Sequence, residues 1–216
     1  MSRTRKTKTR NPAELFLEWD SEKATLRYYD KENKQNVPIE INEVKFVYLD
    51  KLVTITGWSD EHDGGIWSNE CRSTKETFHV HAGKALIGEG NYDWVRTVSG
   101  AKYTASVYVG MAYNGEPLSL VNLKLKGASL GPWIDFVNKI GLEELQGDTA
   151  FQIVNFEDKK KGKNEYKAPV FEVVNSDDIN FNEANGLDET LQKHLDAYLQ
   201  NKNDHVNDDD DLPFED

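Results

Sequence analysis

The residues best suited to specific contacts lie close to the C-terminal end of the sequence. Four aspartates are followed directly by an aliphatic residue, a proline and a phenylalanine, namely Asp208, Asp209, Asp210, Asp211, Leu212, Pro213 and Phe214. Repulsion between like charges favours an extended segment, which leaves the apolar residues available to a hydrophobic pocket rimmed by lysine or arginine. A segment that only improves solubility has no need of Pro213 and Phe214. We therefore interpret residues 208–214 as a partner-binding segment.

A second set of residues combines aromatic rings, which can stack on bases, with lysines and arginines, which can bind phosphates. The candidates for such nucleic-acid contacts are Arg27, Tyr29, Trp58, Trp67, Lys102, Tyr108, Lys124, Lys126, Lys159, Lys160, Lys161 and Lys163. Alternation along two expected strands, 102–113 and 118–126, turns Lys102, Tyr108 and Lys124 to the outer face of one hairpin. A half-exposed sheet with polar residues outside explains the same pattern, so both interpretations stay open.

Other members of this set lie on a further strand, beside a turn and in a loop. Arg27 and Tyr29 share one face of their expected strand. Trp58 and Trp67 flank a glycine turn and can stack on bases, although a tryptophan in a β-rich domain is more often part of the core. The loop 158–163 places its four lysines at a positive tip that suits phosphates. A solvated hairpin turn is the alternative for this loop.

Residue types that support catalysis or metal binding are present without a recognisable arrangement. Residues 61–63 and the pair His79 and His81 resemble ligand clusters, and Cys71 lies between them. Their spacing matches no structural zinc site, and the sequence has no phosphate loop, dinucleotide-binding glycine pattern or serine nucleophile motif. The sequence therefore predicts a protein that is not an enzyme and uses neither a metal nor another cofactor.

Charge is distributed unevenly along the 216 residues, which carry a formal net charge of −12. Residues 1–10 contain five basic and no acidic residues, whereas residues 204–216 contain seven acidic residues and no lysine or arginine. The body between these ends stays acidic, so binding of a polyanion requires cations concentrated on one face. The single cysteine excludes an internal disulfide and fits a reducing, cytoplasmic location. No apolar run is long enough for a membrane helix, and we expect no membrane partner.

The candidate residues must be positioned by a β-rich body. Short runs rich in β-branched and aromatic residues, separated by turn residues, begin near residue 15 and end near residue 174. Residues 44–58 are long enough for one bent strand or two, and residues 92–98 also read as a strand. Asn114 and Gly115 mark a hairpin turn. Many short strands with one helix between them predict a small barrel or a sandwich.

Two helices are expected beside these strands. Residues 129–141 have apolar residues at helical spacing, with Trp133 on the buried face, and residues 187–199 form a second apolar stripe. We expect the second helix to pack on the body, with self-association as the alternative. The chain then divides into a flexible basic arm (1–12), a β-rich domain (13–174), a linker with the amphipathic helix (175–203) and a disordered acidic tail (204–216).

Both ends of the sequence resemble one family. Residues 208–214 resemble the acidic tip of single-stranded DNA-binding proteins, which end in several aspartates, an aliphatic residue, a proline and a phenylalanine. Residues 2–10 resemble the arm, rich in lysine, arginine, serine and threonine, of some bacteriophage members of that family. In the bacterial members phenylalanine is the last residue, whereas Glu215 and Asp216 follow it here, so the match favours the bacteriophage members.

This resemblance implies a mainly β protein, with an OB-fold-like antiparallel barrel, an embedded helix and a C-terminal amphipathic helix. It implies a protein that coats and protects single-stranded DNA. Through its tail, the protein would recruit replication, recombination and repair enzymes such as a polymerase, helicase or nuclease. Two alternatives stay open: a carbohydrate- or protein-binding β-sandwich, and an acidic protein that mimics DNA to inhibit a nucleic-acid enzyme.

Overall fold

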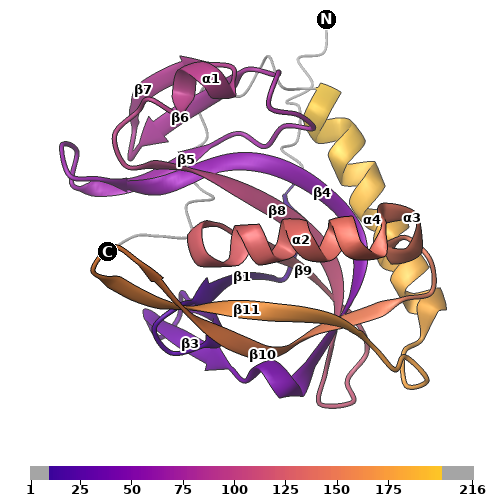
Figure 1. Ribbon diagram of the computed structural model, residues 1–216. Helices are drawn as coiled ribbons and strands as arrows, with labels where there is room; N and C mark the ends of the chain where they lie inside the picture. Colours follow the sequence, from indigo (N-terminus) through magenta and orange to yellow (C-terminus); the bar gives the residue numbers. More distant parts are fainter. Residues whose placement is uncertain (1–9, 201–216) are drawn as a thin grey trace, which may run out of the picture.

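The computed structural model describes residues 10–200 and arranges them around one large, curved sheet (Figure 1). Its strands are β1 (Leu15–Asp20), β2 (Thr25–Asp30), β3 (Gln35–Ile39), β4 (Val44–Ser59), β5 (Gly64–Ser68), β6 (Phe78–Ala82), β7 (Ala85–Gly90), β8 (Ala101–Tyr113), β9 (Ser119–Leu125), β10 (Ala150–Lys161) and β11 (Asn164–Val174). Its helices are α1 (Tyr92–Val95), α2 (Leu130–Ile140), α3 (Leu142–Leu145) and α4 (Phe181–Gln200), with short 3-10 turns at Ile41–Glu43 and Gly127–Ser129. The prediction of a mainly β protein is confirmed. Within this part of the chain, no helix has both the length and the apolar character needed to cross a bilayer.

The sheet is mixed and is not closed into a ring. Its strand order is β3-β2-β1-β9-β8-β4-β5-β6-β7, and β10 joins it by pairing with β4 and with β11. Strands β1 and β9 run parallel, with Leu15 opposite Val121 and Glu18 opposite Lys124. The expected OB-fold-like antiparallel barrel is therefore not confirmed, and antiparallel pairing is wrong for β1 and β9. Strands far apart in the sequence can pair in either direction, and alternation along each strand does not determine which direction they take.

Strand β4 connects the parts of this sheet. The stretch predicted at 44–58 is a single strand, with a register shift between Tyr48 and Asp50. Such an irregularity bends a strand and increases its local twist. Strand β8 pairs along one edge of β4, while β10 pairs near Phe46 and β5 pairs near Trp58. Because β5 and β10 pair at different ends of β4, the strands diverge and leave room for a core.

Helix α2 closes the larger core over strands β10 and β11 (Figure 1). Trp133 and Phe136 lie on the same helix face and contact Phe151 of β10 and Phe171 of β11, with ring centroids 5.4–5.8 Å apart. The prediction that Trp133 belongs to the core is confirmed by its burial. The helix ends at Gly141, whose φ of 91° is a backbone conformation that glycine adopts without steric cost.

Helix α4 packs against the other face of the central strands. Its Leu191 and Leu195 are fully buried in a cluster with Leu52, Tyr108 and Leu120. Tyr108 and Leu120 alternate with Val107, Val109 and Val121, which point into the larger core, so α2 and α4 lie on opposite sides of the sheet. The central strands β4, β8 and β9 are consequently buried on both faces over part of their length.

One strand prediction is wrong. Residues 92–98 begin with the short helix α1, whose start is capped by the Asn91 side chain accepting a hydrogen bond from the backbone N–H of Trp94. Val95 then anchors the helix in a buried cluster with Ile55 and Phe78. A cap and one anchor residue are enough to make a single turn helical where the β propensity of the residues favours a strand.

Candidate nucleic-acid interface

Cross-strand registers bring most of the predicted contact residues to one face of the sheet. Arg27 of β2 lies opposite Glu18 of β1, Glu18 lies opposite Lys124 of β9, and Lys124 lies opposite Ser106 of β8. Residues in direct register point to the same side of a sheet. We call this surface the polar sheet face and define it by Glu18, Arg27, Tyr29, Thr56, Trp58, Trp67, Lys102, Thr104, Ser106, Lys124 and Lys126.

The aromatic part of this face lies where β8, β4 and β5 meet. Lys102 is opposite Thr56, and Trp58 is two residues further along β4 and opposite Gly65 of β5. Trp67 follows Gly65 by two residues and therefore points to the same side. An exposed lysine on β8 thus lies beside β4 and β5, the two neighbouring strands that carry indole rings. This combination of a cation with aromatic faces is what a single nucleic-acid strand requires.

The two tryptophans differ in their surroundings. Trp58 has half of its surface exposed, at 50%, and therefore does not belong to the core. Trp67 is half-buried, stacks on the ring of His81 with centroids 4.4 Å apart, and donates a hydrogen bond from Nε1 to the carbonyl oxygen of Gly83 at 3.2 Å. Both rings are at least partly accessible to a ligand. The positions of the tryptophans in the sequence do not establish this accessibility.

The position of Trp58 depends on a close approach between two glycines. A Cβ on Gly57 would collide with the carbonyl oxygen of Gly100, and a Cβ on Gly100 would collide with the carbonyl oxygen of Trp58. Gly100 also has a φ of 81°, which L residues rarely adopt. The end of β4 can therefore lie against the start of β8 only because neither position carries a side chain.

We expect Gly100→Ala to lower the free energy of unfolding more than Gly115→Ala does. Gly115 has a similar φ of 75° but open space around its Cα, so its substitution costs only the backbone term of about 1–2 kcal/mol. At Gly100 the collision with the Trp58 backbone is added. Urea unfolding of both variants measures the difference, and equal losses of stability would contradict the close-approach argument.

The cations of the β2–β1–β9 part are paired with carboxylates. Lys126 Nζ lies 2.7 Å from Glu18 Oε1, and Arg27 lies 3.2 Å from Asp20 and 3.9 Å from Glu18. The Arg27 side chain is 38% exposed and that of Lys126 is 27% exposed. These cations are therefore reachable, but a phosphate must compete there with Glu18 and Asp20. Tyr29 lies half-buried on the same strand as Arg27.

Tyr108 and Lys124 are not part of an open surface, and the prediction that Tyr108 faces outward is wrong. Tyr108 is fully buried and donates a hydrogen bond of 2.6 Å to Glu70 Oε2. Lys124 Nζ donates to Glu70 Oε1 at 2.6 Å and to Ser106 Oγ at 2.9 Å. The physical reason is that the connection between β5 and β6, which carries Glu70, and helix α4 cover this part of the face.

The carboxylate of Glu70 is the centre of this buried network, which we call the Glu70 cluster: Asn11, Glu70, Ser106, Tyr108, Asn122, Lys124 and Tyr198. Burial by itself raises the pKa of Glu70, but the Lys124 ammonium and hydrogen bonds from Lys124, Ser106 and Tyr108 outweigh it and hold the pKa below its ordinary value of 4.5. Burial and the adjacent Glu70 carboxylate raise the pKa of the Tyr108 hydroxyl well above 10. The cluster therefore contains an ionised carboxylate and an ammonium that compensate each other.

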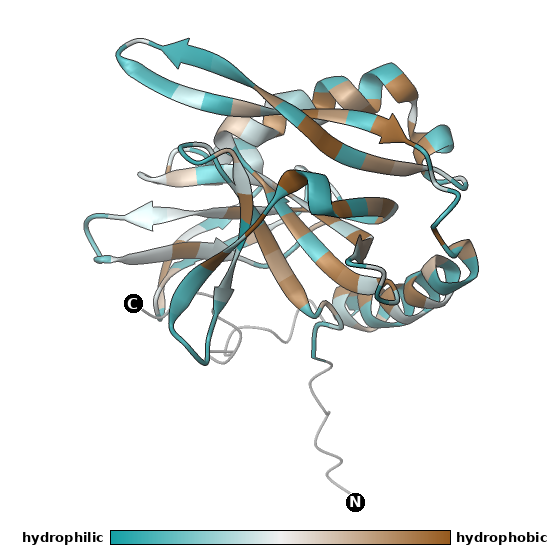
Figure 2. Ribbon diagram, turned by 90° about the horizontal axis from the view of Figure 1, so that it is seen from below, coloured by the Kyte–Doolittle hydropathy of each residue, from teal (hydrophilic) through white to brown (hydrophobic). Residues whose placement is uncertain are grey.

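The four predicted lysines near residue 160 lie on a projecting two-stranded ribbon. The predicted loop 158–163 is too long, because β10 continues to Lys161 and β11 begins at Asn164. Only a tight turn remains, in which Gly162 has a φ of 63°. Figure 2 shows this ribbon extending away from the body with a hydrophilic tip. Alternation cannot distinguish a polar ribbon from a loop, since both faces of an isolated ribbon are solvated.

The lysines of the ribbon differ in their neighbours. Lys159 Nζ lies 2.5 Å from Glu157 and Lys160 Nζ lies 2.9 Å from Glu165. The hydrogen bond and the charge of Glu157 raise the pKa of Lys159 above its ordinary value. Lys161 and Lys163 lie exposed on either side of Gly162. The tip therefore presents cations that no buried carboxylate holds in place.

The base of the ribbon is fixed to the end of the sheet that carries Lys126. Lys167 donates its backbone N–H to the carbonyl oxygen of Ser21 at 2.9 Å, and its own carbonyl accepts a bond of 2.8 Å from Trp19 Nε1. Ser21 follows directly after β1, whose last residue, Asp20, lies beside Arg27. The ribbon therefore leaves the body at the same edge as the cations of the polar sheet face.

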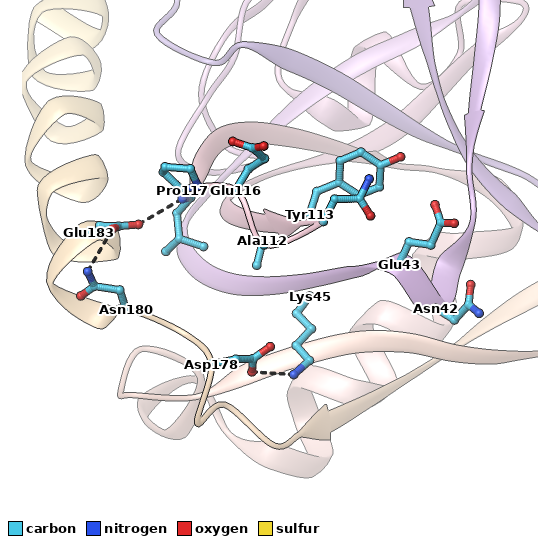
Figure 3. A pocket seen from close by; sticks show the side chains of 13 residues that line it. Asn42, Glu43, Lys45, Ala112, Tyr113, Glu116, Pro117, Asp178, Asn180 and Glu183 are labelled. Atoms are coloured by element: carbon cyan, nitrogen blue, oxygen red, sulfur yellow. Dashed lines mark hydrogen bonds and ion pairs between the residues drawn. The ribbon is translucent and has the colours of Figure 1, made fainter.

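A surface pocket of about 490 Å³ lies elsewhere, where the start of β4, the β8–β9 turn and the start of α4 meet (Figure 3). Its lining includes the carboxylates of Glu43, Glu116, Asp178 and Glu183 and the ammonium of Lys45, which lies 2.6 Å from Asp178. The excess of negative charge disfavours a polyanion. The pocket is also at the opposite end of β4 from the exposed tryptophan.

The clusters that resembled catalytic or metal sites have structural surroundings. Residues 61–63 belong to the β4–β5 turn, where the backbone N–H of His62 donates to Ser59 Oγ. Cys71 is buried and pairs with Val53 through the backbone. His79 lies 3.8 Å from Glu89 on the neighbouring strand. Among residues 10–200, no group of three or more histidines, cysteines or carboxylates is arranged to hold a metal ion.

No protein-family model, no curated protein and no solved structure matches the chain. The candidate interface therefore rests on its own geometry. The predicted partner-binding residues 208–214, the acidic tail that contains them and residues 1–9 of the basic arm lie outside the described residues.

Two residues that shape the interface were not among the candidates from the sequence. Glu18 holds Arg27 and Lys126, and Glu70 holds Lys124. A signal for Glu18 exists, because it alternates with the buried Leu17 and therefore points to the outer face of β1. Glu70 lies in a connection without periodicity, and nothing in the sequence pattern places it over β8 and β9.

Proposed function

We propose that the protein binds single-stranded DNA, independently of base sequence, through the polar sheet face, and that it is not an enzyme. The observation that carries this proposal is the register that places Trp58, Trp67 and Lys102 side by side, continuing toward Lys126 and Arg27. In this proposal the protein coats exposed strands, and residues 208–214 recruit replication, recombination or repair enzymes. The alternatives remain a carbohydrate- or protein-binding module and an acidic DNA mimic.

Two features support a single strand as the ligand. Half-exposed indole rings can stack on bases only where the bases are not already stacked in a duplex, and stacking accepts all four bases because each has a π-face. Among the candidate residues, Lys102, Lys126 and Arg27 lie on the polar sheet face and four further lysines on the ribbon, while four carboxylates line the pocket at the other end of β4. This separation allows an acidic protein to bind a polyanion.

The proposal includes an OB-like arrangement of the body. The long, bent β4 pairs with three other strands, and the exposed Trp58 and the half-buried Trp67 lie where it meets β5. In OB-folds, oligonucleotides bind across the face of the central strands and between neighbouring loops. The ribbon of β10 and β11 takes the place of such a loop in our proposal.

A titration with oligo-dT tests the proposal directly. Trp58 and Trp67 are accessible, so stacking on them should quench the intrinsic fluorescence of the full-length protein. We expect tight binding that weakens as salt rises from about 50 to about 200 mM, because phosphate contacts release counterions. A carbohydrate oligomer serves as the comparison ligand. Absence of quenching by oligo-dT, or binding that does not respond to salt, would contradict the proposal.

The ribbon lysines should contribute to affinity mainly through charge. We expect Lys161→Gln and Lys163→Gln together to weaken oligo-dT binding and to reduce the slope of log K against log salt by about 0.7 for each phosphate that is no longer neutralised. The matched control replaces Lys31 and Lys193, which are exposed lysines away from the ribbon, by glutamine. Equal slopes for the two double variants would show that the ribbon does not contact the strand.

A further inference from the structure

The indole ring of Trp67 is supported from one side by a histidine. Trp67 of β5 and His81 of β6 are directly opposite in the strand register, and their rings lie nearly parallel, with an interplanar angle of 13° and centroids 4.4 Å apart. His81 is buried, whereas Trp67 is half-buried. The imidazole is therefore the inner ring of the pair, and the indole is the outer one.

A local irregularity of the sheet lies beside His81. Between β6 and β7 the register shifts, so that Val80 lies opposite Gly88 and His81 lies opposite Leu86. The additional residue, Ile87, makes β7 the bulged strand. Bulges change the direction of neighbouring side chains and are enriched beside functional sites. The hydrogen bond from Trp67 Nε1 to the carbonyl oxygen of Gly83 also fixes the edge of the indole ring.

On the side of Trp67 away from His81 the neighbouring positions are small. Gly65, which lies opposite Trp58, has no side chain, and Thr56 precedes Trp58 by two residues on the same face. Trp58 and Trp67 are therefore diagonal neighbours across β4 and β5. Of Thr56, Trp58 and Gly65, only Trp58 carries a large side chain.

We propose that His81 is a positioning residue for the stacking of a nucleobase on Trp67. The base lies on the ring face that is turned away from His81, and imidazole, indole and base form one stack. His81 prevents the indole from turning, so the ring loses little freedom when a base binds. This inference rests on the proposed binding of single-stranded DNA and adds a residue that does not touch the strand.

The test compares variants of the full-length protein in the oligo-dT titration. We expect His81→Ala to weaken binding about two- to tenfold, the range of a single aromatic pair. His81→Phe restores a ring and should bind within about twofold of the parent. His79→Ala, on the same strand, is the matched control and should leave affinity unchanged. His81→Leu fills the space without a ring and replaces the alanine variant if thermal unfolding shows that the latter is not folded.

A double-mutant cycle separates positioning from a general structural effect. If His81 acts through Trp67, its replacement has no further effect on affinity in a Trp67→Ala background. An equal loss of affinity with and without Trp67 would overturn the proposal, and so would failure of His81→Phe to restore binding. If the parent protein does not bind oligo-dT at all, the proposed function fails. If the parent binds and His81→Ala binds equally well, only the role of His81 fails.

Discussion

Replacement of Glu70 by glutamine is expected to lower the free energy of unfolding by about 3–5 kcal/mol, because it leaves the Lys124 ammonium without its counter-charge in a largely buried site. The cluster also joins five parts of the chain: the segment before β1, the β5–β6 connection, β8, β9 and α4. The carboxylate accepts a hydrogen bond from Tyr108, and the backbone N–H of Glu70 donates to the hydroxyl of Tyr198 in α4. Urea unfolding followed by circular dichroism measures the loss.

Three further variants identify the origin of this loss. Glu61→Gln removes an exposed glutamate from the β4–β5 turn and should leave stability nearly unchanged. Lys124→Met should destabilise on its own, because the carboxylate then lacks its cation. The double variant Glu70→Gln with Lys124→Met should lose less than the sum of the single losses. Additive losses would show that the pair does not act as a unit.

The same pair makes stability depend on pH in the acidic range. Because the pKa of Glu70 is lower in the folded state than its ordinary 4.5, ionised Glu70 contributes stability above that value. This contribution is lost as pH falls below 4.5 and through the folded-state pKa. The stability difference between the parent and Glu70→Gln should therefore be constant near neutral pH and should narrow under acidic conditions. If the stability difference between the parent and Glu70→Gln does not change with pH, Glu70 is not the source of this pH dependence.

Removal of both Trp58 and Trp67 is expected to have the largest effect on DNA binding. Each base stacked on an aromatic ring contributes about 1–3 kcal/mol, so the double alanine variant should lose roughly 2–6 kcal/mol of binding free energy. Since about 1.4 kcal/mol corresponds to a tenfold change, affinity for oligo-dT should fall by roughly 30-fold or more. Fluorescence anisotropy of a labelled oligo-dT measures binding without depending on the tryptophans that are removed.

Trp94 provides the matched control for these substitutions. It is 73% exposed and lies on α1, which packs through Val95 into the cluster on the other side of β4 from Trp58. Trp94→Ala removes an exposed indole and should leave oligo-dT affinity unchanged. If Trp94→Ala loses as much affinity as the double variant, the binding surface includes α1. If the double variant binds oligo-dT as tightly as the parent does, the polar sheet face is not the binding surface.

Several elements follow from local sequence alone. The turn at Asn114 and Gly115 forms as predicted, and both residues have positive φ angles of 53° and 75°. Helix α2 has Trp133 and Phe136 on its buried face and ends at Gly141, as the spacing of its apolar residues indicated. These features depend on residues close together in the chain, whose backbone preferences and periodicity are visible without a partner.

Other features depend on contacts between distant segments. Alternation correctly assigns Tyr108 and Lys124 to one face of a hairpin, but it does not reveal that Glu70 and α4 cover that face. The parallel pairing of β1 with β9 depends on such a contact, and the helical start of residues 92–98 depends on the burial of Val95 against Ile55 and Phe78 in addition to its local cap. In each case the outcome depends on which remote segment packs there.

The amino-acid sequence by itself determined a mainly β body, its reversal at one hairpin, the core face of one helix, and the strong separation of charge between the ends of the chain. Only the tertiary structure decided which polar residues outside that hairpin share its face, which cations are held by carboxylates, and which tryptophan rings are accessible. The physical reason is that side-chain periodicity is a property of one strand, whereas strand order, pairing direction and burial of a second face arise from long-range packing.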